Sequence, residues 1–294
     1  MTVTLLEVDT VVAVDIGGTK LAVGIVGADG RIRDRRQVPT PVTSDADALL
    51  ATLTTEIDGL GAAVGRARAV GVGCGGPMTR GGEAVSPLNI PAWRGFPLRA
   101  RLAAHCGLTV RIDNDAKALA RAEGWMGAAT GVSDYVAMVV STGIGGGIVV
   151  DGRLLEGADG NAGHVGHIIV EPDGAICGCG ARGCVEAEAS GTAIARSTGR
   201  PPAEAPDEIR ARTGRLVGRA IASVANLLDL QLAVVSGSVA LGYGATFFTA
   251  AQDEIDARCR LDFSRATKIV PGALGDDGPL VGAAAVALFA PTAK

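Results

Sequence analysis

The sequence has 294 residues, of which 48% are hydrophobic and 20% are charged, and its net charge is −4. This composition indicates a folded chain with two ordinary domains or one large one, and it argues against extensive disorder. The acidic balance excludes the basic surface that a nucleic-acid-binding protein needs. Because aromatic residues make up only 3% of the chain, we expect a core of Val, Leu, Ile and Ala in α/β layers.

The N-terminal segment has no basic stretch followed by an apolar run, so we expect no signal peptide. The longest apolar run lies near Leu280–Ala290. It is too short to cross a bilayer and is expected to form a buried helix. We therefore expect a cytoplasmic protein with no membrane partner.

The first half of the chain opens with a strand, a glycine-rich turn, a strand and a second turn. Val11–Val14 and Leu21–Val26 are the apolar runs, Asp15–Lys20 contains the first turn, and Asp29-Gly30 is the second. The further elements expected here are a strand over 31–38, a helix from about 45 to 60, a strand over 70–73, a helix over 98–105, a strand over 109–112 and a helix over 116–126.

The same pattern returns about 125 residues later. Tyr135–Val140 is expected to be a strand, Ser141–Gly147 a glycine-rich turn, Ile148–Val150 a strand and Asp151-Gly152 a turn. Two related halves with a cleft between them are a natural place to bind a nucleotide. The remaining elements expected are a helix over 214–228, a strand over 232–236, a helix over 246–258, a strand over 269–270 and a helix over 279–289.

The first glycine-rich turn has the composition of an anion-binding loop. Gly17 and Gly18 let backbone N–H groups approach an anion without interference from a Cβ atom. The Thr19 hydroxyl and the Lys20 amine add donors, and Asp15 is suited to holding Mg²⁺ directly or through water. The alternative is an ordinary hairpin turn.

The second half offers the same chemistry at the Ser141–Gly147 turn, and again at a turn after a later strand. The residues expected to contact ATP there are Thr142, Gly143, Gly145, Gly237 and Ser238. The occurrence of two such turns in related halves favours nucleotide binding over ordinary hairpins. Neither of the paired turns has the P-loop pattern, and neither precedes a helix as the dinucleotide-binding loop does.

Three of the six cysteines fall within eight residues, and a histidine precedes them. His167, Cys177, Cys179 and Cys184 supply one imidazole and three thiolates, a tetrahedral ligand set suited to Zn²⁺. Since four protein ligands leave no open coordination position, we expect a structural zinc ion. The alternative is three reduced cysteines without a metal. The scattered cysteines are expected to be small buried hydrophobes.

Two residues beside this segment are candidates for binding a polar ligand such as a sugar. Glu186 lies two residues after the last cysteine, and a zinc ion that fixes the backbone would also fix its carboxylate. His164 lies three residues before His167. The alternative for Glu186 is a solvated surface acid.

Asp113-Asn114-Asp115 closes a strand that is expected to be buried. Asn114 can donate to and accept from sugar hydroxyls. Asp115 can take the proton of a hydroxyl that attacks a γ-phosphoryl group. We therefore expect Asp115 to be a general base, and the alternative is that it only caps the following helix.

These residues together resemble the ROK family (repressors, open reading frames and kinases), in particular its bacterial sugar kinases. The resemblance runs from Asp15 to about Ala284. The motifs that carry it are Asp-Ile-Gly-Gly-Thr-Lys at 15–20, Asn-Ile-Pro-Ala-Trp at 89–93, Asn-Asp-Ala at 114–116, Ser-Thr-Gly-Ile-Gly-Gly-Gly at 141–147 and the segment from His167 to Glu186.

The resemblance implies an α/β fold of the two-lobed, actin-like ATPase (RNase H-like) type, with a cleft between the lobes. A small lobe is expected over residues 1–114 and about 283–294, and a large lobe with the zinc site over 115–282. The resemblance further implies Asp115 as the catalytic base, ATP with Mg²⁺, a structural Zn²⁺ and homodimers or homotetramers. The residues that it implies for the sugar site are Gly75, Asn89, Asn114, Asp115, His167 and Glu186.

The chain departs from the family at one position. His164 stands where many family kinases carry a Glu that contacts the sugar near its anomeric end, although some N-acetylmannosamine kinases carry that His. We expect an ATP-dependent hexose 6-kinase, with glucose as the first choice and N-acetylmannosamine or another N-acetylhexosamine as the alternative. The sequence leaves open whether ATP or polyphosphate is the phosphate donor.

Two functions of other classes remain as alternatives. A sugar-responsive repressor of the same family would carry a helix-turn-helix domain before the first glycine-rich turn, where fourteen residues precede Asp15. A non-catalytic sugar sensor would have lost activity, and the only support for it is the departure at His164.

Overall fold

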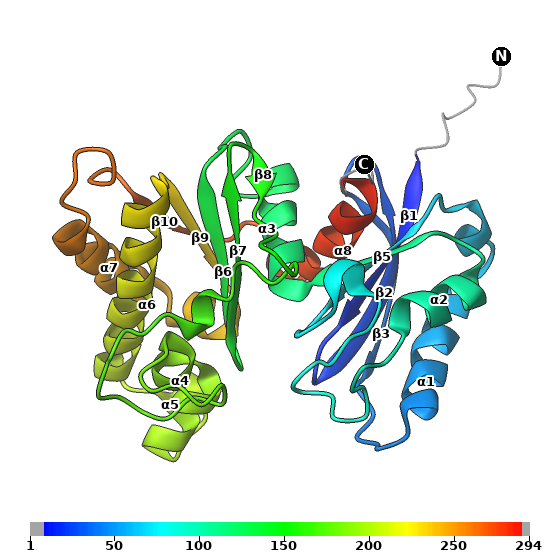
Figure 1. The fold of residues 1–294 in the computed structure, drawn as a ribbon, viewed down its shortest axis with the longest axis horizontal. Helices are drawn as coiled ribbons and strands as arrows, with labels where there is room; N and C mark the ends of the chain where they lie inside the picture. The colour runs from blue at the N-terminus through cyan, green and yellow to red at the C-terminus, as the bar shows by residue number, and fades with distance from the viewer. Residues whose placement is uncertain (1–8, 290–294) are drawn as a thin grey trace. The chain divides into compact units, whose positions relative to one another are not determined.

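The computed structural model describes residues 9–289, which form two compact units, each built on a five-stranded sheet (Figure 1). Unit 1 consists of residues 9–122, Ala158–Asn161 and 276–289. Unit 2 consists of Glu123–Gly157 and Ala162–Gly275. Among the residues described, no helix combines the length and the apolar character needed to cross a bilayer.

The division between the units falls at other places than the 114/115 and 282/283 boundaries expected from the sequence. It lies inside helix α3 (Asp115–Met126), after Ala122, and unit 1 takes in the chain from residue 276. The first turn of α3 contacts the unit 1 sheet at Gly73, and the whole of α8 (Gly278–Leu288) covers that sheet. Residues 1–8 and 290–294 of the expected small lobe lie outside the described residues.

The sheet of unit 1 has the strand order β3-β2-β1-β4-β5. The first three strands pair antiparallel, whereas β4 and β5 continue the sheet in parallel with β1. The edge strand β3 is exposed and charged, which discourages pairing with another chain. The strands are β1 (Thr10–Ile16), β2 (Lys20–Gly27), β3 (Ile32–Pro39), β4 (Val70–Cys74) and β5 (Val110–Asn114).

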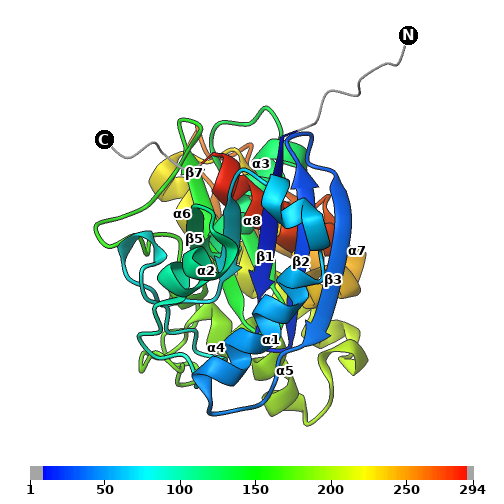
Figure 2. The ribbon, with the colours of Figure 1, turned by 90° about the vertical axis from the view of Figure 1, so that its right-hand side faces the viewer.

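Helices cover both faces of this sheet. Figure 2 shows α1 (Ala46–Asp58) and α2 (Leu98–Cys106) over one face and α8 over the other. Asp45 caps α1, because its side chain accepts from two N–H groups of the first turn. Helix α8 is buried almost all round, as expected for the apolar run near the end of the chain.

The sheet of unit 2 has the order β10-β9-β6-β7-β8, which repeats the connectivity of unit 1. Here β6, β7 and β8 pair antiparallel, and β9 and β10 are parallel to β6. The internal repeat predicted from the sequence is therefore confirmed. The strands are β6 (Tyr135–Val140), β7 (Ile144–Val150), β8 (Arg153–Leu154), β9 (Leu232–Ser236) and β10 (Lys268–Pro271).

Two long helices, α6 (Asp207–Leu228) and α7 (Ser238–Arg258), pack together on one face of this sheet (Figure 1). They approach closely at Gly214, where a Cβ atom would lie 2.3 Å from the Phe247 carbonyl oxygen. The shorter helices are α4 (Val185–Ala189) and α5 (Gly191–Thr198). Five 3₁₀ turns occur in the described residues, at Gly61–Arg66, Arg80–Gly82, Val165–His167, Pro202–Glu204 and Gly275–Asp277.

Several expected element boundaries are corrected by the structure. The glycine-rich turn ends at Gly143, and the following glycines lie in β7, where a Cβ on Gly146 would come within 2.6 Å of Val165 Cγ2. Helices α6 and α7 begin earlier than expected, and α4 and α5 were not predicted. Glycines near the start of α7, including Gly244 with φ 54°, mask its helical pattern in the sequence.

We predict that Gly71→Ala destabilises unit 1. A Cβ atom at this position would lie 1.9 Å from the Ala283 carbonyl oxygen, so α8 would have to move away from β4. The expected loss is about 1–3 kcal/mol in the free energy of unfolding, measured by urea denaturation. The control is Gly65→Ala, because its Cβ would meet nothing within 4 Å. Equal stability of both variants would contradict the close contact.

Candidate functional site

In unit 1, the expected site residues gather where three parallel strands end. The register places Asp15 of β1 opposite Gly73 of β4, and Gly73 opposite Asp113 of β5. A Cβ on Gly73 would lie 3.6 Å from Asp115 Cα and 3.8 Å from Asp15 Oδ1. The two carboxylates predicted for Mg²⁺ binding and for general-base chemistry therefore lie at the same edge of one sheet.

Asp115 is the first residue of α3, directly after β5. Its Oδ1 accepts from Ala116 N at 2.8 Å. Asn114 Oδ1 accepts from Ala116 N at 3.0 Å and from Lys117 N at 3.3 Å, so Asn114 also caps the helix. The capping role considered for Asp115 is thus shared with Asn114, and its role as a general base stays a prediction.

Asn89 and Gly75 lie at the same edge of unit 1. A Cβ on Gly18 would lie 2.7 Å from Asn89 Cβ, so Asn89 lies directly against the first glycine-rich turn. A Cβ on Gly75 would contact Pro87, two residues before Asn89. Within the turn, Gly17 N donates to the Lys20 carbonyl at 3.0 Å, which is the bond of a tight hairpin. Thr19 and Lys20 complete the turn and lead into β2.

The electrostatics of this edge favour a cation. Burial, and then the nearby Asp115 carboxylate, raise the pKa of Asp15 to about 7, although Lys20 and Arg35 oppose the shift. Asp15 is only 8% exposed. Two close carboxylates, one of them nearly buried, form a donor set that fits a hard divalent cation such as Mg²⁺.

Unit 2 brings its glycine turns together by the same geometry. The parallel strands β6 and β9 end side by side, and Ser141 Oγ lies 3.0 Å from Ser238 Oγ. Gly237 has φ 99°, and a Cβ there would lie 2.4 Å from the Val140 carbonyl oxygen. Ser238 begins α7, whose N-terminus carries a partial positive charge that favours an anion such as phosphate.

A mostly apolar cavity of about 510 Å³ opens beside these turns in unit 2. This volume is within the usual range for a small-molecule site. Thr142 and Ser238 were expected from the sequence, whereas the other wall residues were not. They come from α5, α7 and the Pro201-Pro202 segment, for which the sequence suggested no ligand contact. The walls consist of Thr142, Gly191, Thr192, Ala195, Pro201, Pro202, Ala203, Ser238, Val239, Gly242 and Tyr243.

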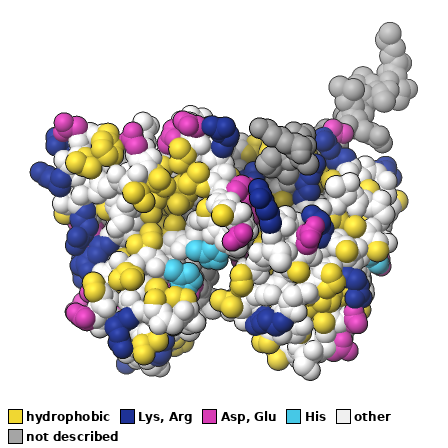
Figure 3. Space-filling model, in the orientation of Figure 1, with side chains coloured by type: hydrophobic (Ala, Val, Ile, Leu, Met, Phe, Trp, Pro, Cys, Tyr) yellow, Lys and Arg dark blue, Asp and Glu magenta, His cyan; other side chains and the backbone are white. Residues whose placement is uncertain are grey.

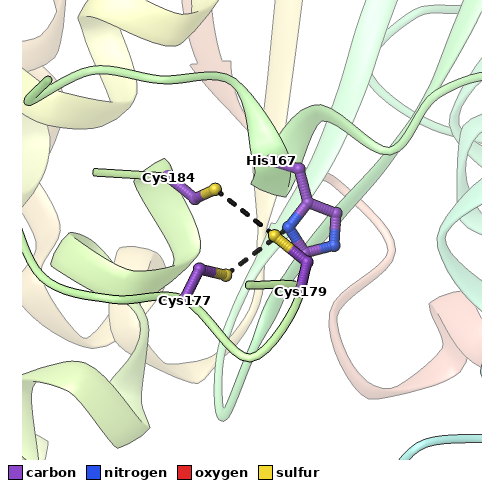
Figure 4. Close-up of side chains that lie close together, drawn as sticks. All are labelled: His167, Cys177, Cys179 and Cys184. Atoms are coloured by element: carbon purple, nitrogen blue, oxygen red, sulfur yellow. Dashed lines mark hydrogen bonds between the residues drawn. The ribbon is translucent and has the colours of Figure 1, made fainter. Parts of the chain in front are cut away.

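The four predicted zinc ligands converge (Figure 4). His167 Nδ1 lies 3.6 Å from Cys177 Sγ, and Cys179 Sγ lies 3.7 Å from Cys184 Sγ. All four ligand atoms lie within 4.8 Å of one another. Tetrahedral Zn²⁺ with Zn–S bonds of about 2.3 Å separates its ligand atoms by about 3.8 Å. The ligand set therefore fits a structural zinc ion.

Glycines allow this segment to fold so tightly. Gly183 has φ 74°, and a Cβ there would lie 1.5 Å from the Glu171 carbonyl oxygen. Backbone hydrogen bonds from Cys177 N to Ala181 O and from Gly180 N to Cys177 O close the loop that carries the ligands. Burial raises the pKa of the Cys184 thiol to about 12, so zinc binding would release a proton from a site that otherwise retains it.

Glu186 lies on α4 and is linked to the second glycine-rich turn. Its Oε2 accepts from Ile144 N at 2.9 Å, so it is not the solvated acid considered as an alternative. A Cβ on Gly143 would lie 2.9 Å from the same oxygen. The zinc segment and the Ser141–Gly143 turn are thus joined by a carboxylate, while Gly145 lies in β7.

His164 and His167 lie close to one another, with their ring centroids 6.0 Å apart. They are the only histidines of unit 2, and Figure 3 shows histidine side chains at the surface of the unit that carries β6–β10. His164 is exposed and His167 is half-buried. The site residues therefore form two groups. Unit 1 holds Asp15, Gly17, Gly18, Thr19, Lys20, Gly75, Asn89, Asn114 and Asp115, and unit 2 holds the others.

We predict that Cys184→Ser removes bound metal. Wild-type protein should contain about one zinc ion per chain by elemental analysis, and the variant should contain almost none, because one of four ligands is lost. Thermal unfolding of the variant should occur at a lower temperature. Cys106→Ser is the control, because Cys106 is outside the cluster. Zinc retained in full by Cys184→Ser would refute the assignment.

We also predict that the free energy of unfolding depends on pH through Asp15. Its pKa is raised in the folded state, so the folded chain binds the extra proton, and stability falls as pH rises from about 4 to about 7. Between pH 5 and pH 8, without added Mg²⁺, the free energy of unfolding of the wild type should fall by on the order of 2–3 kcal/mol relative to that of Asp15→Asn. Urea denaturation at both pH values measures this. Parallel pH profiles would show that Asp15 is not perturbed.

The ROK family model matches residues 11–289. The N-acetylmannosamine kinase of Escherichia fergusonii is 40% identical over 252 residues, which cover 80% of this chain and 85% of that protein.

Two solved structures are also similar. A ROK hexokinase from Thermus thermophilus has 33% identity and a TM-score of 0.79, with 94% of this chain and 97% of that chain covered. A ROK glucokinase from Streptomyces griseus, in complex with glucose and AMPPNP, has 31% identity and a TM-score of 0.80, with 94% and 98% covered. The expected actin-like α/β fold is confirmed. The chain belongs to the ROK family and is a sugar kinase, a phosphotransferase that acts on a sugar hydroxyl.

Proposed function

We propose that this kinase transfers the γ-phosphoryl group of ATP to the 6-hydroxyl of N-acetylmannosamine. The observation that carries the choice of sugar is the 40% identity to an N-acetylmannosamine kinase over most of both chains. His164 supports the choice of N-acetylmannosamine, because some N-acetylmannosamine kinases of the family resemble this chain in carrying a histidine at this position. N-acetylmannosamine was the alternative in the sequence analysis and is now the leading candidate.

Glucose, the first choice from the sequence, becomes the second candidate. It is supported by the similarity to the Streptomyces griseus glucokinase, whose structure contains glucose, at 31% identity. An N-acetyl group makes the two sugars differ strongly in size and hydrogen bonding at one carbon. A site that satisfies one of them is therefore expected to disfavour the other.

We assign the proton transfer to Asp115. Its carboxylate takes the proton of the sugar 6-hydroxyl while that oxygen forms a bond to the γ-phosphorus. The bond between the γ-phosphorus and the bridging oxygen breaks, and ADP leaves with the electron pair. Asn89, Asn114, His164, His167 and Glu186 are assigned to the sugar, with Gly75 leaving space for it.

The glycine-rich turns are assigned to the phosphates. Mg²⁺ bound with ATP would supply the positive charge that the transferring phosphoryl group requires, and Asp15 would hold it directly or through water. Thr19, Lys20 and Thr142 add donors, and Gly17, Gly18, Gly143 and Gly145 let the backbone come close. The cavity beside Gly237 and Ser238 is assigned to the adenosine, because its apolar walls suit a base.

Zinc is proposed as a structural ion. In the cluster His167 directs Nδ1 toward Cys177 Sγ, so its Nε2 is the nitrogen left for the sugar. Glu186 uses one oxygen for Ile144 N, which would leave the other for the sugar. Four ligands close the coordination sphere, and the ion would act by fixing these two side chains. ATP as the donor and a homodimer or homotetramer remain part of the proposal.

The decisive measurement is a coupled ADP-release assay over hexoses and N-acetylhexosamines, with wild type and His164→Glu side by side. Wild type should turn over N-acetylmannosamine with a kcat/KM about tenfold or more above that for glucose. His164→Glu should move this ratio toward glucose, since it replaces a donor or acceptor with an anionic acceptor. Preference for glucose by the wild type would favour the second candidate.

Asp115→Ala is the matched control for this assay. Loss of the base should lower kcat by about 10²–10⁴-fold, whereas sugar binding measured by calorimetry should remain. Near-normal turnover by this variant would exclude Asp115 as the base. If His164→Glu leaves the ratio of kcat/KM for the two sugars unchanged, His164 does not contribute to sugar specificity.

A further inference from the structure

One buried charge is not accounted for by the proposed chemistry. Lys117 lies in the first turns of α3, two residues after Asp115, and is only 2% exposed. Its Nζ contacts Asp113 Oδ1 at 3.1 Å, which compensates for part of the cost of burying both charges. Arg121 approaches the other oxygen of the same carboxylate at 3.5 Å. Asp113 therefore already has a second basic partner.

Lys117 also makes a contact far away in the sequence. Its Nζ donates to the Gly160 carbonyl oxygen at 3.0 Å. Gly160 belongs to the segment Ala158–Asn161, which packs as part of unit 1. The chain immediately before and after this segment belongs to unit 2. Lys117 thus bonds to a short segment of unit 1 whose two ends continue into unit 2.

Backbone hydrogen bonds fix the chain on both sides of this segment. Ala162 N donates to the Glu156 carbonyl at 3.0 Å and closes residues 157–161 into a loop, which we call the strap. Leu155 N donates to the Ile148 carbonyl at 2.8 Å and ties the chain before the strap to β7. Gly163 lies against the same strand, where a Cβ would come within 2.8 Å of the Gly146 carbonyl oxygen.

His164 follows directly on this anchored base, three residues after the end of the strap. The tip of the strap is held by the helical turn that begins with Asp115. Lys117 therefore connects α3, which begins with the proposed base, to the strap. The strap is followed along the chain by His164, which is proposed to contact the sugar. A loop that is already ordered costs a ligand less conformational entropy on binding than a loose one.

We propose that Lys117 is a positioning residue for sugar recognition, which holds the strap so that the segment leading to His164 is ordered before the sugar binds. This rests on the proposed function of that segment. The strap itself is a property of the chain and can be measured without a substrate.

The test compares three variants. Lys117→Met keeps the length of the side chain but removes the donor. Gly160→Ala leaves the Lys117–Asp113 pair intact but displaces the carbonyl, because Gly160 has φ 82°, which alanine rarely adopts. Its Cβ would have only Arg80 Cα nearby, at 3.9 Å, so steric overlap is not the cause. Arg121→Met is the control, because it weakens the pairing of the same Asp113 carboxylate while the Lys117–Gly160 bond is kept.

Both strap variants should raise KM for the sugar by about tenfold, while KM for ATP and kcat at saturating sugar change little. Amide hydrogen exchange over 157–161 should be faster in both variants than in wild type and Arg121→Met. If Lys117→Met is too unstable to purify, Gly160→Ala carries the same test. A sugar KM that rises equally in Arg121→Met, or unchanged exchange in the strap variants, would overturn the proposal.

The two proposals fail in different ways. If wild type does not phosphorylate N-acetylmannosamine, the proposed sugar is wrong, and KM is measured with the hexose that is turned over. The exchange comparison needs no sugar, so it decides whether Lys117 orders the strap in either case.

Discussion

The register of parallel strands is the constraint on which both halves of this protein depend. Parallel strands in register end at one edge of their sheet, so residues far apart in the sequence come together there. In unit 1 this brings Asp15 to the same edge as Asp115, with Gly73 between them. In unit 2 it brings the turn after β6 to the start of α7. A single geometric rule, used twice, brings together the two carboxylates of unit 1 and the two turns of unit 2.

That geometry has an electrostatic consequence. The two carboxylates at this edge repel each other, and the burial of Asp15 removes water that would screen its charge. The result is a raised pKa at Asp15 and a local preference for a cation. Mg²⁺ bound with a nucleotide at this edge would relieve the repulsion. The same environment would be a liability in a protein without a cationic ligand.

The zinc segment works by short-range constraint instead. Its ligands are so close in sequence that a tight, glycine-containing loop is enough to bring three of them together. The loop then leads straight into α4, where Glu186 bonds to the start of β7. An ion in this position would stabilise a region with little apolar core of its own. In the described residues, the small apolar cluster here consists of two of the candidate ligands, Cys177 and Cys184, together with Ala187.

The sequence by itself determined the parts of this protein that depend on local spacing. The duplicated strand–turn–strand pattern, the cluster of one histidine and three cysteines and the family follow from residues that are neighbours along the chain. Non-local packing decided the rest. The meeting of Asp15 with Asp115 depends on strand register, the cavity walls from Pro201 to Tyr243 depend on how helices pack, and the bond from Lys117 to Gly160 spans 43 residues. No local pattern records these contacts, because each is fixed only when separate elements are packed against one another.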